Sequence, residues 1–307
     1  MINGLVAVSL HDVLERRQEM ETGFDHLSER VVAVGVDESP ESAAAARYAL
    51  RAANDRGLDL LLVHAYLQPN FTIPVDQRNL DACRESAERL VRQVAAQLAL
   101  PNTMRIRSEV RPQMPASLLL DVARRVPLLV VGQDHPTWDK RLLFGRVAAQ
   151  VAQRSDCPVA VVPSGWRVIS TTDSHHPVVI ALEGTSPARP ALHFAFKQAA
   201  AGGSRLVALH VTRYLSRQAD ITERTASLTE LLAGWQQDYP GVNVDVLVVR
   251  GDEEKSLLRW SNSAAAVVVE RPHRHWWNPW AHSLIGTVLS RTHCPLIIVP
   301  QVSTTPR

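Results

Sequence analysis

The sequence predicts an α/β protein built from two tandem, doubly wound domains, each with a five-stranded parallel sheet. Three observations lead to this prediction: short apolar runs alternate with segments of helical periodicity, the alternation restarts near residue 177, and matching residues recur in both halves. Cys157-Pro158, for example, stands before the last apolar run of the first half, and Cys294-Pro295 stands before that of the second. A period of about 140 residues indicates two copies of a domain and not a solenoid.

In the first half, the apolar runs predict buried strands and the periodic segments predict helices. Ser39 and Pro40 are typical of a helix start, as the N-cap and the first helical residue, and Gly57 is typical of a helix end. The expected order is strand 30–37, helix 40–56, strand 58–66, helix 76–98, strand 104–110, helix 117–125, strand 128–131, a helix that includes Val147 and Val151, and strand 159–162.

The polar stretch 165–176 predicts a linker, after which the pattern repeats. The second half is expected to have a strand at 177–183, a helix start at Ser186-Pro187, a strand at 205–211, a helix at 220–239 weakened by Gly234, and strands at 242–249 and 296–299. We therefore divide the chain into an N-terminal extension at 1–29, a first domain at 30–164 and a second domain at 177–301.

Composition excludes several classes of protein. A formal net charge of +2 is too small to favour nucleic acid or an anionic membrane surface as a partner. No apolar run reaches the roughly 20 residues of a membrane-spanning helix, and the N-terminus lacks the pattern of a signal peptide. Three cysteines without paired spacing suit a reducing compartment. These features predict a cytoplasmic protein that binds neither membrane nor nucleic acid.

The motifs VAVGVDESPES, LLLVHAY, LLVVGQDH and LLFGRVAAQVAQRSDCPVAVV, with their counterparts in the second half, resemble the universal stress protein family. The resemblance covers nearly everything from Arg30 to Gln301, as a tandem protein. It implies a fold like that of the adenine nucleotide alpha hydrolases, with the two halves packed as a pseudo-dimer through their last strands, 159–162 and 296–299. It also implies homodimers or other self-association of the whole chain.

The resemblance further implies an ATP site in the first half. Family members that bind ATP carry an Asp after the first strand and a Gly-x2-Gly-x9-Gly-[Ser/Thr] signature after the fourth. Here the middle glycine is replaced by His135 and the Ser/Thr by Arg146. A ring at His135 opposes close approach of a phosphate, whereas the charge of Arg146 favours it. The cofactor-binding residues implied in this way are Val36, Asp37, Ala65, Gly132, His135, Gly145, Arg146 and Val147.

The second half departs further from the family signature. Glu270 stands at the position of the first glycine, His282 at that of the third, and Glu183 in place of Asp37. Since a carboxylate at the first-glycine position would repel phosphate, any ATP is expected in the first half.

The loop Arg271–His282 (RPHRHWWNPWAH) allows three interpretations. His273, His275 and His282 would be the ligands of a metal site, although no cysteine or carboxylate has supporting spacing. Alternatively, the tryptophans pack against the sheet edge, or the loop docks a protein partner, since Trp and Arg are favoured at interface centres.

Other candidate groups have simpler structural explanations. His64 and His210 are expected to be core or backbone-capping histidines, and Cys157 and Cys294 small buried residues and not a redox pair. No catalytic motif is present, so at most slow ATP hydrolysis is expected. Two function classes remain open: a stress-response regulator that switches with ATP occupancy, and a nucleotide-free interaction scaffold.

Overall fold

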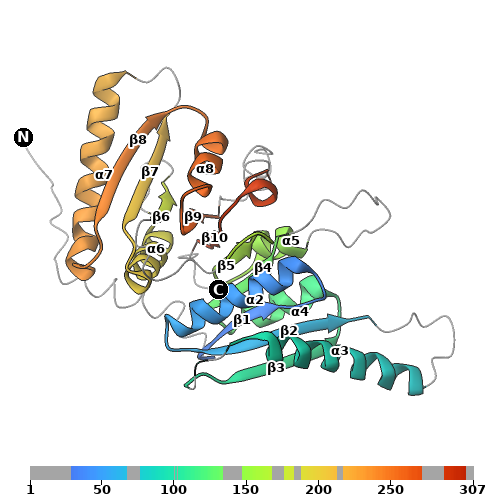
Figure 1. The fold of residues 1–307 in the computed structure, drawn as a ribbon. Coiled ribbons are helices and arrows are strands. Elements are labelled where there is room, and N and C mark those ends of the chain that lie inside the picture. The colour runs from blue at the N-terminus through green and yellow to red at the C-terminus, as the bar shows by residue number, and fades with distance from the viewer. Residues whose placement is uncertain are drawn as a thin grey trace, which may run out of the picture.

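The computed structural model describes residues 29–67, 77–99, 101, 103–133, 147–167, 176–182, 188–212, 217–271 and 287–301. Helices and strands alternate along both halves (Figure 1). The elements of the first half are β1 (Val31–Gly35), α2 (Pro40–Asn54), β2 (Asp59–Tyr66), α3 (Gln77–Gln97), β3 (Ile106–Pro112), α4 (Pro115–Ala123), β4 (Leu128–Gly132), α5 (Val147–Arg154) and β5 (Val159–Val162). Those of the second half are β6 (Val178–Ala181), α6 (Arg189–Gly202), β7 (Leu206–Thr212), α7 (Gln218–Asp238), β8 (Val244–Arg250), α8 (Glu253–Ser261), β9 (Ala266–Glu270) and β10 (Leu296–Val299), and residues 287–291 are also helical.

All ten strands belong to one sheet, in the order β3-β2-β1-β4-β5-β10-β9-β6-β7-β8. The pairs within each half are parallel, and the halves meet where β5 and β10 pair antiparallel, with Ile297 opposite Ala160. Each half thus protects the edge that the other would expose. The predicted fold class is confirmed, including the pseudo-dimer formed through the last strands.

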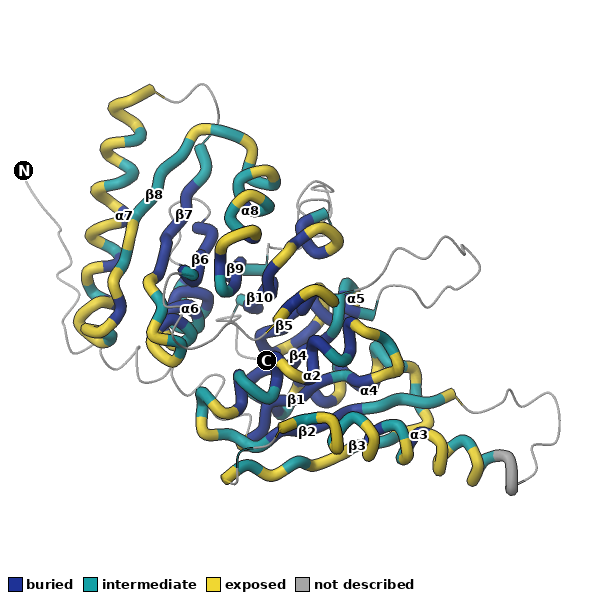
Figure 2. Tube along the Cα trace, in the orientation of Figure 1, coloured by how far each residue is buried: buried dark blue, intermediate teal, exposed yellow. Residues whose placement is uncertain are grey.

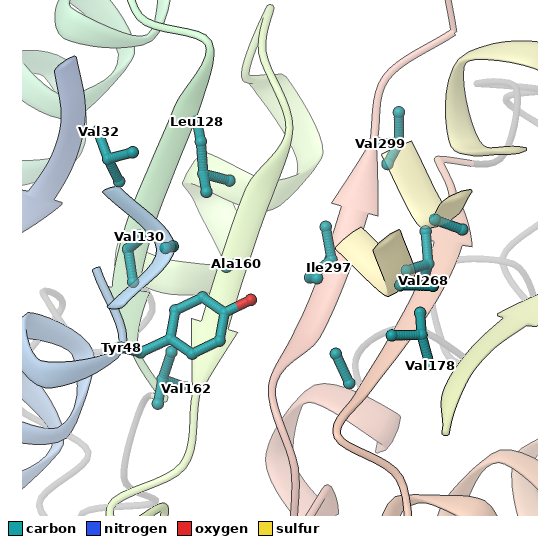
Figure 3. Close-up of a cluster of buried hydrophobic side chains, with 14 of the residues drawn as sticks. Val32, Tyr48, Leu128, Val130, Ala160, Val162, Val178, Val268, Ile297 and Val299 are labelled. Atoms are coloured by element: carbon teal, nitrogen blue, oxygen red, sulfur yellow. The ribbon is translucent and has the colours of Figure 1, made fainter. Parts of the chain in front are cut away.

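The two faces of the sheet carry separate cores. Helices α2, α3, α6 and α7 contribute to one buried cluster, and α4, α5, α8 and residues 287–291 to the other. In Figure 2 the strands next to the junction are buried, whereas α3 and α7 are largely exposed. Figure 3 shows that the first cluster continues across the junction, from Ala160 on β5 to Ile297 on β10. Because fully burying one Val, Leu or Ile side chain contributes about 1.5–3 kcal/mol, this shared core holds the halves together.

Side chains also connect the halves on both faces. On the face of α2 and α6, the Arg56 guanidinium donates to Gln198 Oε1 at 2.7 Å and lies 5.3 Å from the centre of the Phe194 ring. On the opposite side, Gln133 Nε2 donates to the carbonyl oxygen of Leu289 at 2.6 Å, and the Arg271 guanidinium donates to that of Ser155.

Helix starts show where the two copies differ. Helix α2 begins as predicted, with Pro40 as its first residue and the Ser39 hydroxyl accepting from the Ser42 amide. The start predicted at Ser186-Pro187 is wrong, because α6 begins at Arg189 with Ala188 at the N-cap and no side-chain cap. Helix α4 begins at Pro115, two residues before the predicted start, and its N-cap is Met114.

Candidate functional site

The strand order places a topological switch point in the first half, between β1 and β4. From β1 the chain proceeds outward to β2 and β3, and then crosses back to β4 on the other side of β1. Open parallel sheets bind ligands at the carboxyl ends of the strands at such a point. Val36 and Asp37 directly follow β1, Gly132 ends β4, and Ala65 is next to last in β2. Four predicted site residues therefore share one edge of the sheet.

Asp37 is held by two serines. The amide and the hydroxyl of Ser39 both donate to Asp37 Oδ1, at 2.9 and 2.5 Å, and the Asp37 amide donates to Ser42 Oγ at 2.8 Å. The Asp37 side chain is exposed, and its Oδ2 atom has no hydrogen-bond partner among the residues described by the structure. The carboxylate is thus fixed in orientation with one oxygen open to accept a donor from a ligand.

Gly132 has a packing role that the sequence did not reveal. A Cβ atom built at this residue would lie 2.7 Å from the carbonyl carbon and 2.8 Å from the Cβ of Glu41, in the first turn of α2. No side chain fits there. The close approach of α2 to β4 therefore requires a glycine at position 132, whether or not a phosphate binds there.

The equivalent place in the second half is built differently. Glu270 ends β9 as Gly132 ends β4, so a side chain is present where the first half has none. Helix α2 begins four residues after Val36, whereas α6 begins seven residues after Leu182, the counterpart of Val36. The two halves thus have different edges at their switch points.

The structure describes only one of the remaining predicted site residues. Val147 is the first residue of α5 and packs against the second core, whereas His135, Gly145 and Arg146 lie outside the described residues. Residues 272–282 of the Arg271–His282 loop also lie outside them, so the metal, packing and docking interpretations remain predictions. In the part of the chain that is described, no group of three or more His, Cys, Asp or Glu side chains could hold a metal ion. Arg271, the first residue of this loop, is described, and its guanidinium donates to the carbonyl oxygen of Ser155 within the same chain.

Burial raises the pKa of two thiols and one phenol in the core. Burial raises the pKa of both the Cys157 and the Cys294 thiol to about 12, so neither is a reactive thiolate at neutral pH. Burial likewise raises the pKa of Tyr48 to about 12. Its ring packs edge-on against Trp166 at 5.3 Å, and its hydroxyl has no hydrogen-bond partner in the described structure.

Sequence reasoning identified Ser39 as a helix cap but missed that it also orients Asp37. The available signal was the spacing Asp-x-Ser-x-x-Ser over residues 37–42, which places two hydroxyls in the turn that follows the carboxylate. The contacts of Gln133 and Arg271 across the halves have no comparable signal, because their partners are backbone carbonyls more than a hundred residues away.

This tandem α/β architecture, with a switch-point site in its first half, matches known proteins. The model of the universal stress protein family matches residues 29–163 and again 175–300. A universal stress protein of Mycobacterium tuberculosis is 30% identical over 276 residues, covering 84% of this chain and 90% of the relative. One from Mycolicibacterium smegmatis is 30% identical over 291 residues, covering 90% and 95%. The crystal structure of a universal stress protein from Archaeoglobus fulgidus has the same fold, with a TM-score of 0.64 at 17% identity, covering 90% of this chain and 97% of that one.

The chain belongs to the universal stress protein family and carries two of its domains in tandem. The resemblance inferred from the sequence motifs is thereby confirmed. Among the helices that are described, none combines the length and apolar character needed to cross a membrane.

Proposed function

We propose that the first half binds an adenine nucleotide, ATP in the first instance, and that the chain is a regulator whose conformation or partners change with nucleotide occupancy. The observation that carries this proposal is the position of Asp37. Its carboxylate is oriented by Ser39 at the switch point between β1 and β4, with Oδ2 available to a ligand. A fixed acceptor at the carboxyl ends of parallel strands suits the adenosine part of a nucleotide.

The other roles follow from the family. Ala65 would meet the base through its backbone, Gly132 and Val36 would line the floor of the site, and the segment His135–Val147 would surround the phosphates. In that segment Gly145 precedes α5, so amides at the start of the helix would face the phosphates and Arg146 would supply charge. The chain acts in this proposal as a cytoplasmic binding protein and not as an enzyme.

The decisive experiment compares matched variants of the two halves. Titration calorimetry of ATP into the wild-type chain should show one site. Asp37→Ala should remove this site, and Glu183→Ala, at the corresponding position of the second half, should leave it intact. Equal loss from either variant, or no binding by the wild type, would overturn the proposal. Release of an adenine nucleotide from the denatured purified protein would support it independently.

A second candidate function is favoured by a different observation. The contact with Glu41 is enough to explain why residue 132 is a glycine, so this glycine gives no support to phosphate binding. The second half has Glu270 at the equivalent position. The chain would then be a nucleotide-free scaffold that self-associates or docks a protein through the Arg271–His282 loop. Replacing Trp277 and Trp280 with Ala should weaken self-association or partner capture while leaving the thermal midpoint nearly unchanged. A fall of many degrees would instead make these tryptophans part of the core.

A further inference from the structure

Helix α5 in the first half is contacted by a charged side chain from the second half. Arg271 follows β9, and its guanidinium donates to the carbonyl oxygen of Ser155, the residue that directly follows α5. The backbone of Arg271 is itself fixed, since its amide donates to the carbonyl oxygen of Val299 on β10 at 2.8 Å. The contact therefore joins the end of a strand in one half to the end of a helix in the other.

The carbonyl of Ser155 belongs to the carboxyl end of α5. The Ser155 amide donates to the carbonyl oxygen of Val151 at 2.9 Å, so this residue completes the last turn of the helix. Carbonyls in a last turn have no partner within the helix and carry the negative end of its dipole. A guanidinium suits this place, because it is always charged and has several N–H donors. Arg271 thus satisfies the carbonyl and also complements the dipole.

Helix α5 depends on such contacts because it is short. It has eight residues, and helices shorter than about 12–15 residues are marginal in water without packing. Its buried side chains are Ala148, Val151 and Ala152, of which the two alanines bury little apolar surface. A charge-assisted hydrogen bond at the carboxyl end therefore matters more for the position of α5 than it would for a long, well-packed helix.

The second half receives a different contact in return. Gln133 follows β4, and its Nε2 atom donates to the carbonyl oxygen of Leu289, which lies in the helical residues 287–291. The last helix of the half that carries Asp37 is thus contacted at its carboxyl end by a cation from the other half, and the last helix of the other half by a neutral amide. The charged contact occurs at the helix for which the proposed function requires a fixed position.

We propose that Arg271 is a positioning residue for the nucleotide site, through which the second half holds α5 so that its first amides face the phosphates. The inference rests on the proposed function and adds a residue from the half that is not expected to bind nucleotide. Amides that are aimed before binding attract phosphate more strongly, since ordering them during binding costs affinity. A cation at the carboxyl end and an anion at the amino end also complement the same helix dipole.

The test compares ligands with and without phosphates in the full-length chain. In titration calorimetry, Arg271→Ala should weaken ATP binding at least about threefold, because the contact that fixes α5 is lost, and should leave adenosine binding unchanged. Arg271→Lys, which keeps a cation near the Ser155 carbonyl, should retain most of the ATP affinity. The matched control is Gln198→Ala, which removes the contact with Arg56 between the halves on the opposite face of the sheet. It should leave the binding of both ligands unchanged.

A second ligand and a second variant make the result decisive. Inorganic triphosphate, which has no base, should lose affinity for Arg271→Ala as ATP does. If Arg271→Ala does not fold, Arg271→Gln, which introduces the neutral amide that Gln133 provides in the opposite direction, takes its place. Equal weakening of ATP and adenosine, or ATP binding as tight as that of the wild type, would show that Arg271 only supports the fold. If the wild type binds no ATP, the proposed function fails and this inference fails with it.

Discussion

The Nδ1 atom of His64 lies 2.7 Å from the carbonyl oxygen of Val36. Because a carbonyl can only accept, Nδ1 carries the proton and the histidine ties the end of β2 to the residue that precedes Asp37. His210 makes the same contact with Leu182 in the second half, also at 2.7 Å. Both histidines therefore cap the backbone, as predicted, and in the first half the cap fixes the chain beside the candidate site.

The two histidines can be compared directly by mutation. His64→Ala and His210→Ala should each lower the free energy of unfolding by about 1 kcal/mol, the usual contribution of one hydrogen bond. Only His64→Ala should also weaken ATP binding, because only its partner adjoins Asp37. Chemical denaturation and titration calorimetry measure the two effects. Weaker binding in the His210 variant would show that the loss is general and not local.

Two glycines should respond to alanine in opposite directions. Gly132→Ala places a Cβ atom 2.7 Å from the Glu41 carbonyl carbon, and such overpacking should destabilise the fold by about 1–3 kcal/mol. Gly234 lies inside α7 with nothing within 4 Å of a Cβ, so Gly234→Ala should stabilise by about 0.5–1 kcal/mol. Denaturation midpoints of the two variants decide the matter. A neutral Gly132→Ala would mean that α2 can shift away from β4.

The hydroxyl of Tyr48 is expected to destabilise the fold. It is buried without a hydrogen-bond partner among the described residues, a situation that costs about 1–3 kcal/mol. Tyr48→Phe keeps the ring that packs against Trp166 and removes the hydroxyl, so it should raise the thermal midpoint. Tyr48→Ala, the control, should lower it sharply because the ring is lost. A lower midpoint for Tyr48→Phe would reveal a partner for the hydroxyl.

Stability should fall steeply at alkaline pH. Burial raises the pKa of the Cys157 and Cys294 thiols from 9.0 to about 12, so above pH 9 the unfolded chain loses these protons while the folded chain keeps them. The unfolded state then binds fewer protons, and the free energy of unfolding decreases between pH 9 and 12. Denaturation midpoints across this range should be flatter in the double variant Cys157→Ala, Cys294→Ala. An unchanged slope would contradict the assignment.

The regular elements were predictable because their signals are local or repeated. The apolar run at 159–162 and its copy at 296–299 gave both strands without error, and pairing them followed from the need to cover two edges. The start of α2 followed from Ser39 and Pro40. The start of α6 did not follow from the same Ser-Pro pair at 186–187, since the helix begins at Arg189 with Ala188 as an N-cap that makes no side-chain hydrogen bond.

The candidate site was predictable only as far as the family motif reached. Asp37 and Gly132 were identified from it, but the packing role of Gly132 depends on Glu41, which lies on another element. The orientation of Asp37 by Ser39 and the exposure of Met114 depend on local geometry that the sequence pattern does not encode.

The antiparallel pairing of β5 with β10 joins two halves whose sequences differ. In a dimer of identical subunits, every substitution at the two-fold interface appears twice and must be compatible with itself. In this chain the two halves are parts of one polypeptide, so a substitution on one side of the junction appears once and need not be compatible with itself. Gln133 follows β4 as Arg271 follows β9, yet the amide donates to the carbonyl of Leu289 and the guanidinium to that of Ser155, so equivalent positions make different contacts. The two edges of one continuous sheet can therefore differ in sequence while the strands of both halves stay paired.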